Sequence, residues 1–230
     1  MKEKNNFPIR INKYLANKGY SSRRGADGLI EKKLVTINGR IAILGDIVKE
    51  KDIVEIKTKN APKILYAIYY KSAGEVKETI LINGVTLYAV DQLEKEIPGI
   101  VLFTNDRRVA SRINDRKYIH EREYVIHMRD KIRENFKEKI LNGVYIDGKK
   151  ELVAAKGAEV IDEKICAIVL TENAQHLVRR IAVALFNEAR EIERVRIANI
   201  TNEGIKNGNS RELSVLEQKE LLSSLSLESI

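Results

Sequence analysis

The side chains best suited to nucleophilic or metal chemistry are few and widely separated in this chain. The single cysteine, Cys166, lies in an apolar run, where a buried and unreactive thiol is expected. His120, His127 and His176 are too scattered for a metal site, have no nucleophile beside them, and are expected at surface or strand positions. The sequence therefore predicts no metal centre.

Positive charge is the second chemical feature, and it is concentrated near the N-terminus. The chain of 230 residues has a formal net charge of +8, and residues 1–59 hold 10 Lys and 4 Arg against 7 acidic residues, a surplus of +7. Such a segment is typical of a module that binds a polyanion, because each neutralised phosphate releases condensed counterions. A lysine-rich surface that is merely well solvated would give the same counts, so charge alone leaves both interpretations open.

Hydrophobic residues are numerous but never form a long run. They make up 43% of the chain, which is enough for a buried core. No apolar run approaches the roughly 20 residues that a membrane span requires, and the first residues lack a signal-peptide core. We therefore expect a soluble cytoplasmic protein.

The first 57 residues show the pattern of two helices packed on a small sheet. Helical periodicity covers residues 11–19, and a serine pair is a candidate cap for a second helix over residues 21–32. The pair Asn38-Gly39 between two β-prone runs predicts a hairpin, and residues 52–57 alternate as a further strand. These patterns predict a small basic domain over residues 1–57.

A polar stretch at residues 58–63 is expected to be a linker to a larger domain over residues 64–222. Strands and helices alternate irregularly in this domain, which predicts an α+β fold with a largely antiparallel sheet. Residues 223–230 are expected to be a tail, a poorly specified helix or disorder. The expected strands cover residues 65–70, 87–90, 100–104, 123–128 and 167–171, and the expected helices cover residues 109–113, 131–141 and 175–186.

Residues 9–16, 21–24 and 35–40 resemble the RNA-binding domain named after small-subunit ribosomal protein S-four. In that family, two helices present basic side chains to structured RNA. The resemblance implies that the matching basic residues bind RNA: Arg10, Lys13, Arg23, Arg24, Lys32 and Arg40.

Further along, five blocks resemble the RsuA/RluB-like ribosomal RNA pseudouridine synthases in order and spacing. They cover residues 66–74, 99–106, 120–126, 170–181 and 193–197. The resemblance implies a mixed-sheet domain with a central cleft, uridine isomerisation without metal or cofactor, and ribosomal RNA or ribosomal particles as partner. We also expect a monomer.

The catalytic motif of that family, Gly-Arg-Leu-Asp, corresponds to Asp91-Gln92-Leu93-Glu94 when counted back from Gly99. The resemblance implies that the aspartate acts as nucleophile or base on the ribose, paired with the arginine. Glu94 keeps the carboxylate but adds a methylene, and Gln92 cannot make the charged bidentate contact of arginine. Asp91 adds a second negative charge, which should repel phosphate.

Tyr124 matches the tyrosine on which the family stacks the extruded base. An ordinary strand aromatic is the competing interpretation, and the sequence by itself favours it. Further RNA contacts are expected from Arg107, Arg179 and Arg180.

Two interpretations of function follow. In the first, the RNA-binding scaffold persists on or with ribosomal particles, in ribosome biogenesis, with lost or much reduced isomerisation. In the second, an active synthase uses Glu94. The first is favoured because two substitutions alter the pair that does the chemistry. A compensating arginine would favour the second, and Arg107 and Arg108 are the nearest candidates.

Overall fold

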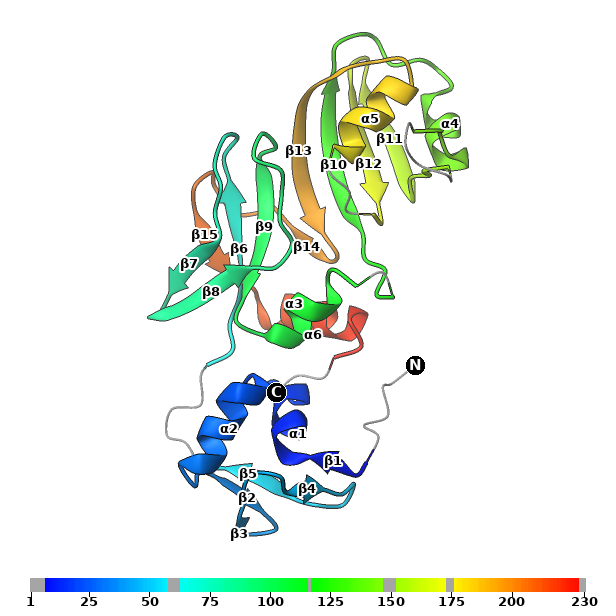
Figure 1. The fold of residues 1–230 in the computed structure, drawn as a ribbon. Helices are drawn as coiled ribbons and strands as arrows, with labels where there is room; N and C mark the ends of the chain where they lie inside the picture. The colour runs from blue at the N-terminus through cyan, green and yellow to red at the C-terminus, as the bar shows by residue number, and fades with distance from the viewer. Residues whose placement is uncertain (1–6, 58–62, 116, 147–151, 173–175, 228–230) are drawn as a thin grey trace.

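The N-terminal part of the computed structural model consists of two helices lying over short strands (Figure 1). The structure describes residues 7–57, 63–115, 117–146, 152–172 and 176–227. The N-terminal helices are α1 (Ile11–Asn17) and α2 (Arg23–Glu31), and the strands are β1 (Ile9–Arg10), β2 (Val35–Ile37), β3 (Arg40–Ile41), β4 (Ile47–Val48) and β5 (Val54–Ile56). Strands β1 and β4 pair, the others form a sheet in the order β3-β2-β5, and the whole encloses a hydrophobic cluster of its own.

Local sequence signals explain this part well. The Ser22 hydroxyl accepts a hydrogen bond from the Gly25 amide at 3.0 Å and so caps α2. Asn38 and Gly39 have φ angles of 52° and 80°, as a two-residue turn between β2 and β3 requires. The predicted helices and hairpin are therefore confirmed.

The larger part is built on one continuous sheet. Its main path runs β11-β12-β10-β13-β9-β6-β15, with β14 paired to β13 and the hairpin β7–β8 joined to β9. The pairings are antiparallel except the one between β9 and β13, which confirms the predicted mainly antiparallel α+β fold. The strands are β6 (Tyr66–Lys71), β7 (Thr79–Ile82), β8 (Val85–Ala89), β9 (Gly99–Thr104), β10 (Arg122–Met128), β11 (Gly157–Asp162), β12 (Ile165–Leu170), β13 (Ala189–Ile197), β14 (Ile200–Thr201) and β15 (Ser210–Glu212).

Four helices cover this sheet. Helices α4 (Phe136–Asn142) and α5 (Leu177–Ala184) pack on the half formed by β10, β12 and β13, and α3 (Arg107–Arg112) and α6 (Val215–Ser224) pack near β6 and β9 (Figure 1). The hairpin β7–β8 covers the opposite face of β6 and β9. Strand β9 is therefore buried along its whole length, so the loop that precedes it starts from a fixed position. No helix within the described residues is long and apolar enough to cross a membrane.

Several elements differ from the sequence-based expectation, since β7, β11, β14 and β15 are not among the expected strands. Helix α4 and strand β13 differ for identifiable reasons. Helix α4 begins at Phe136 rather than at residue 131, because the preceding backbone bonds elsewhere: the Ile132 amide donates to the Glu163 carbonyl at 2.7 Å. Strand β13 was not predicted, since its sequence Ala-Arg-Glu-Ile-Glu-Arg-Val-Arg-Ile is rich in charge. It becomes a strand by pairing with β10 on one side and β9 on the other.

The C-terminal end is more ordered than expected. Helix α6 begins with a capping box between Ser214 and Glu217, and Leu225, just after the helix, is buried in the core. Glu217 also accepts two hydrogen bonds from Arg211, at 2.7 and 2.9 Å. The expected tail over residues 223–230 thus starts inside a helix, and residues 228–230 lie outside the described part. Most of the expected linker, residues 58–62, also lies outside it.

Replacing Glu217 with glutamine is expected to lower the free energy of unfolding by about 1 to 2 kcal/mol at pH 7, after discounting for solvent screening. The hydrogen bonds from Arg211, with those from Ser214, lower the pKa of Glu217 to about 2. Since this folded pKa lies below the unfolded value of about 4.3, the stabilisation is complete above that pH and is lost as the pH falls toward 2.

Thermal unfolding at pH 7, 4 and 2.5 checks this, with Glu138→Gln on the exposed face of α4 as the matched control. A loss of equal size at pH 2.5 and pH 7 would contradict the assigned role.

Candidate active site

The loop of residues 91–98 leads from β8 into β9 and contains the positions that match the catalytic motif. Asp91 is fully buried, Gln92 is exposed, and Glu94 is partly exposed. The four residues therefore do not share one environment, and Gln92 and Glu94 are the polar ones with exposed surface.

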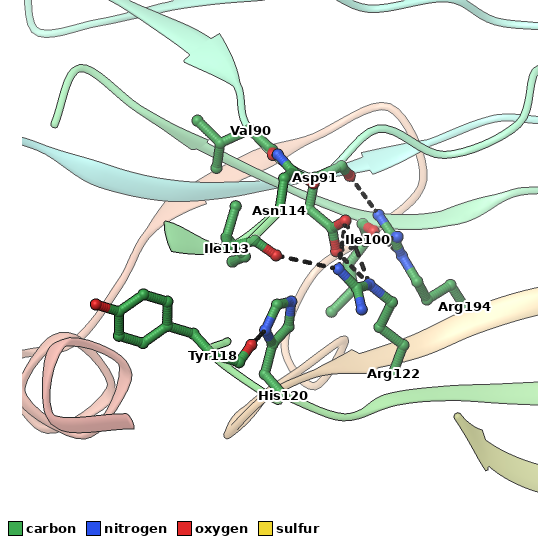
Figure 2. A network of polar contacts seen from close by, with 9 residues as sticks. All are labelled: Val90, Asp91, Ile100, Ile113, Asn114, Tyr118, His120, Arg122 and Arg194. Atoms are coloured by element: carbon green, nitrogen blue, oxygen red, sulfur yellow. Dashed lines mark hydrogen bonds and ion pairs between the residues drawn. The ribbon is translucent and has the colours of Figure 1, made fainter. Parts of the chain in front are cut away.

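Asp91 lies between two buried arginines that come from distant strands (Figure 2). Arg122 on β10 donates from Nε and Nη2 to the two carboxylate oxygens, at 3.0 to 3.3 Å. Arg194 on β13 donates from Nη1 to Oδ2 at 3.3 Å and from Nη2 to the Asp91 carbonyl at 2.8 Å. The start of the loop is therefore fixed to both strands by a charged cluster inside the core.

This cluster corrects the expectation that Asp91 would repel phosphate. Burial raises the pKa of Asp91, but Arg194 and Arg122 outweigh it and hold the pKa below its usual value. The carboxylate is thus ionised, buried and neutralised by its neighbours. Its charge stabilises the two arginines and is not presented at the surface.

Three further hydrogen bonds fix the middle and the end of the loop. Buried Lys71 donates from Nζ to the Lys95 carbonyl at 2.8 Å, and the Gly74 amide donates to the same oxygen at 2.8 Å. The Arg194 amide donates to the Pro98 carbonyl at 3.0 Å. Gly99 then passes so close to Arg194 that a Cβ would lie 2.3 Å from its carbonyl oxygen, so only glycine fits.

Glu94 points across to the start of helix α5, where it contacts His176. Its Oε1 accepts a hydrogen bond from the His176 amide at 2.6 Å, and its Oε2 lies 2.8 Å from His176 Nδ1. Both carboxylate oxygens are therefore held by one residue. Glu94 is paired here with a histidine, whereas the resemblance implied an arginine.

The ring of Tyr124 is buried, with only 5% of the residue exposed. It points to the same side of β10 as Arg122, and burial raises its pKa. In this arrangement no face of the ring is open to a base, so base stacking stays a prediction that requires the ring to become exposed.

Three other candidates for chemistry are now placed. Burial raises the pKa of the Cys166 thiol to about 12, so the expectation of an unreactive thiol is confirmed. His127 is exposed on β10, as expected, but His120 is buried: its Nδ1 lies 3.0 Å from the Tyr118 carbonyl, and its Nε2 has no hydrogen-bond partner among the described residues (Figure 2). Within the described residues, no group of three or more His, Cys, Asp and Glu side chains could hold a metal ion.

Known proteins resemble this chain over most of its length. The family model of the S4 domain matches residues 9–54. The dual-specificity RNA pseudouridine synthase RluF of Escherichia coli is 28% identical over 90% of this chain and 76% of its own length. The ribosomal large subunit pseudouridine synthase B of Bacillus subtilis is 26% identical over 92% of this chain and 95% of its own. The chain is a homologue of the RluF/RsuA-type RNA pseudouridine synthases.

A solved structure gives the same result for the fold. A crystal structure of a pseudouridylate synthase superimposes with a TM-score of 0.64, covering 93% of this chain and 99% of the other at 23% identity. The larger part of the chain therefore has the pseudouridine synthase fold, and the sheet described above is its scaffold.

The basic residues predicted to bind RNA in the S4 domain are all exposed. Arg40 pairs with Asp46 at 2.7 Å, which partly neutralises it, while the others make no ion pair with another described residue. The exposed and unneutralised residues are Arg10, Lys13, Arg23, Arg24 and Lys32. Their role in RNA binding stays a prediction that this exposure supports.

The arginines of the synthase-like part are placed differently from one another. Arg107 is exposed at the first turn of α3, whereas Arg108 pairs with buried Asp106 at 2.7 Å and so does not supply the missing arginine. Arg179 donates to the Ala189 carbonyl at 3.1 Å and so ties α5 to β13, and Arg180 beside it is partly exposed.

Sequence reasoning missed the three residues that organise the site. Arg122 and Arg194 lay inside recognised blocks but were not assigned a role, and His176 was expected at a surface or strand position without a role in the site. The sequence offered one signal, and it concerned the two arginines. An arginine at an inward-facing position of a strand is buried and therefore needs a carboxylate partner.

Proposed function

We propose that this protein binds structured ribosomal RNA on a pseudouridine synthase scaffold, and that its uridine isomerisation is lost or much reduced. The observation that supports this most is the state of Glu94, whose two carboxylate oxygens are both occupied by His176. The buried arginines nearby are held by Asp91, and the family's arginine position carries exposed Gln92.

The chemistry explains why these contacts matter. The isomerisation breaks the bond from base to ribose, rotates the base and rejoins it through carbon, and it needs a free carboxylate placed to within about 1 Å. A carboxylate whose two oxygens are both in contact with His176 must give up one of these contacts before it can attack the ribose or take up a proton. The expected result is slow chemistry on a scaffold that still binds RNA.

We further propose how the chain is used. Residues 1–57 act as the RNA-binding domain, and residues 58–63 act as a linker. Residues 64–222, together with the end of α6, act as the synthase-like domain. The protein acts in the cytoplasm as a monomer, on or with ribosomal particles, in ribosome biogenesis. The RNA-modifying relatives and the exposed basic residues support the RNA-binding part of this proposal.

A second candidate is an active synthase that uses Glu94. The accessibility and fixed position of Glu94 favour this candidate. The Glu94 side chain is 19% exposed and is held in one defined position. A preorganised carboxylate at the reacting position is what a working site would require.

A pseudouridine map of ribosomal RNA from cells with and without the gene distinguishes the two. We expect an unchanged map, with the protein still co-sedimenting with ribosomal particles. Loss of one pseudouridine on deletion would overturn the proposal in favour of the active synthase. In that case Glu94→Gln should abolish the site, while Glu96→Gln on the exposed side of the same loop should not.

A further inference from the structure

The contact between Glu94 and His176 joins two segments that are 82 residues apart. Glu94 lies in the 91–98 loop, and His176 is the residue immediately before helix α5. Because the histidine supplies both an amide hydrogen and a ring nitrogen, one residue holds both oxygens of the carboxylate. Such a two-point contact fixes the orientation of the carboxylate as well as its position.

The backbone of the loop cannot move to follow a shorter side chain. It is fixed on either side of Glu94 by the arginine contacts of Asp91 and by the hydrogen bonds to the Lys95 carbonyl. Aspartate at position 94 would withdraw the carboxylate by about 1.5 Å, the length of one carbon–carbon bond. The contact with the His176 amide, now 2.6 Å, would then exceed hydrogen-bonding distance.

His176 has a backbone conformation that suits this role. Its φ angle of 56° lies in the left-handed region, which histidine, asparagine and aspartate tolerate better than most residues. In this conformation the amide and the ring both face Glu94. The residue is followed by the first turn of α5, which also carries Arg179 and Arg180.

We propose that His176 is the positioning residue for Glu94, and that glutamate at position 94 is matched in length to His176. Glu94 is therefore an adapted residue rather than a degraded aspartate. The pair links the 91–98 loop to helix α5, which carries Arg179 and Arg180, so that the loop and the helix move as one unit. This inference rests on the proposed function only where it concerns RNA, since the contact itself can be tested without any activity.

Hydrogen exchange of the His176 amide in the full-length protein tests the length match, because this amide donates to Glu94 Oε1. Glutamine keeps an acceptor oxygen at the same distance, so Glu94→Gln should retain the protection. Glu94→Asp should lower it about tenfold, the equivalent of a typical capping bond. Protection in Glu94→Asp equal to that in the wild type would overturn the proposal.

His176→Asn and His176→Asp provide a matched pair for the other partner. Both side chains have the same size and tolerate the left-handed backbone, but only asparagine can donate to Glu94, while aspartate repels it. Protection of the residue-176 amide should survive in His176→Asn and fall about tenfold in His176→Asp, by the same capping-bond estimate. Equal protection in the two variants would remove the side chain of His176 from the positioning role. Circular dichroism confirms that each variant is folded.

Pseudouridine formation on ribosomal RNA transcripts, measured with the same variants, separates this inference from the proposed function. If the wild type isomerises, the proposed loss of activity is wrong; His176→Asn should then keep kcat, and His176→Asp and Glu94→Asp should lower kcat with KM unchanged. A rise in KM with kcat unchanged would contradict a positioning role. If the wild type does not isomerise, Glu94→Asp should not restore activity, and restoration would overturn the length match.

Discussion

Replacing Asp91 with alanine is expected to lower the free energy of unfolding by about 3 to 5 kcal/mol, because the change leaves two arginines in the core without a counter-charge. Arg122 and Arg194 are both almost fully buried, and Asp91 contacts each of them at 3.0 to 3.3 Å. A guanidinium cannot lose its proton to escape this cost. The energy lost is therefore mainly the penalty of unpaired buried charge.

Urea unfolding at pH 7, followed by circular dichroism, measures this change. The matched control is Asp130→Ala, which breaks an exposed ion pair with Arg129 and should cost less than about 1 kcal/mol. The pKa of Asp91 is lowered in the folded state, so its contribution is complete above the unfolded pKa of about 3.9 and is lost below it. A loss of under about 1 kcal/mol for Asp91→Ala would show that water or a shift of the arginines compensates.

Reversing the charge of Arg23 and Arg24 together is expected to weaken RNA binding and to make its salt dependence shallower. Both side chains are exposed at the start of α2, and neither makes an ion pair with another described residue. If each contacts one phosphate, the slope of log affinity against log salt should decrease in magnitude by about 1.5 to 2. Affinity for a structured ribosomal RNA fragment should fall at every salt concentration that is physiological or lower.

The control for this variant reverses the same amount of charge elsewhere in the S4 domain. Lys49 and Lys51 are exposed between β4 and β5, so Lys49→Glu with Lys51→Glu changes the net charge equally. Filter binding or fluorescence anisotropy from 50 to 300 mM salt gives both slopes. The same slope in the Arg23/Arg24 variant as in the wild type would exclude these two residues from the interface.

The relation between Glu94 and His176 changes how altered catalytic motifs are interpreted. Glutamate in place of aspartate suggested damage when the motif was considered alone. The structure places this carboxylate against His176, 82 positions away. The extra methylene of glutamate lets the carboxylate reach the His176 amide. A substitution in a recognised motif is therefore better judged after its partner is known.

Local signals in the sequence determined much of the architecture. The Asn38-Gly39 turn, the serine cap of α2 and the apolar periodicities need only residues that are near neighbours in the chain, so the elements they specify were predictable. The order of motif blocks likewise predicted the synthase fold, which the relatives and the solved structure confirm.

The tertiary structure alone decided the state of the site. The partners of Asp91 lie 31 and 103 residues away, and the partner of Glu94 lies 82 residues away. No sequence pattern as short as a helix turn or a pair of adjacent strands indicates that these side chains meet. Charge neutralisation depends on distance in space, which strand pairing between β10, β13 and β9 sets. For this reason Asp91, which the sequence suggested would repel phosphate, is instead neutralised by two arginines in the fold.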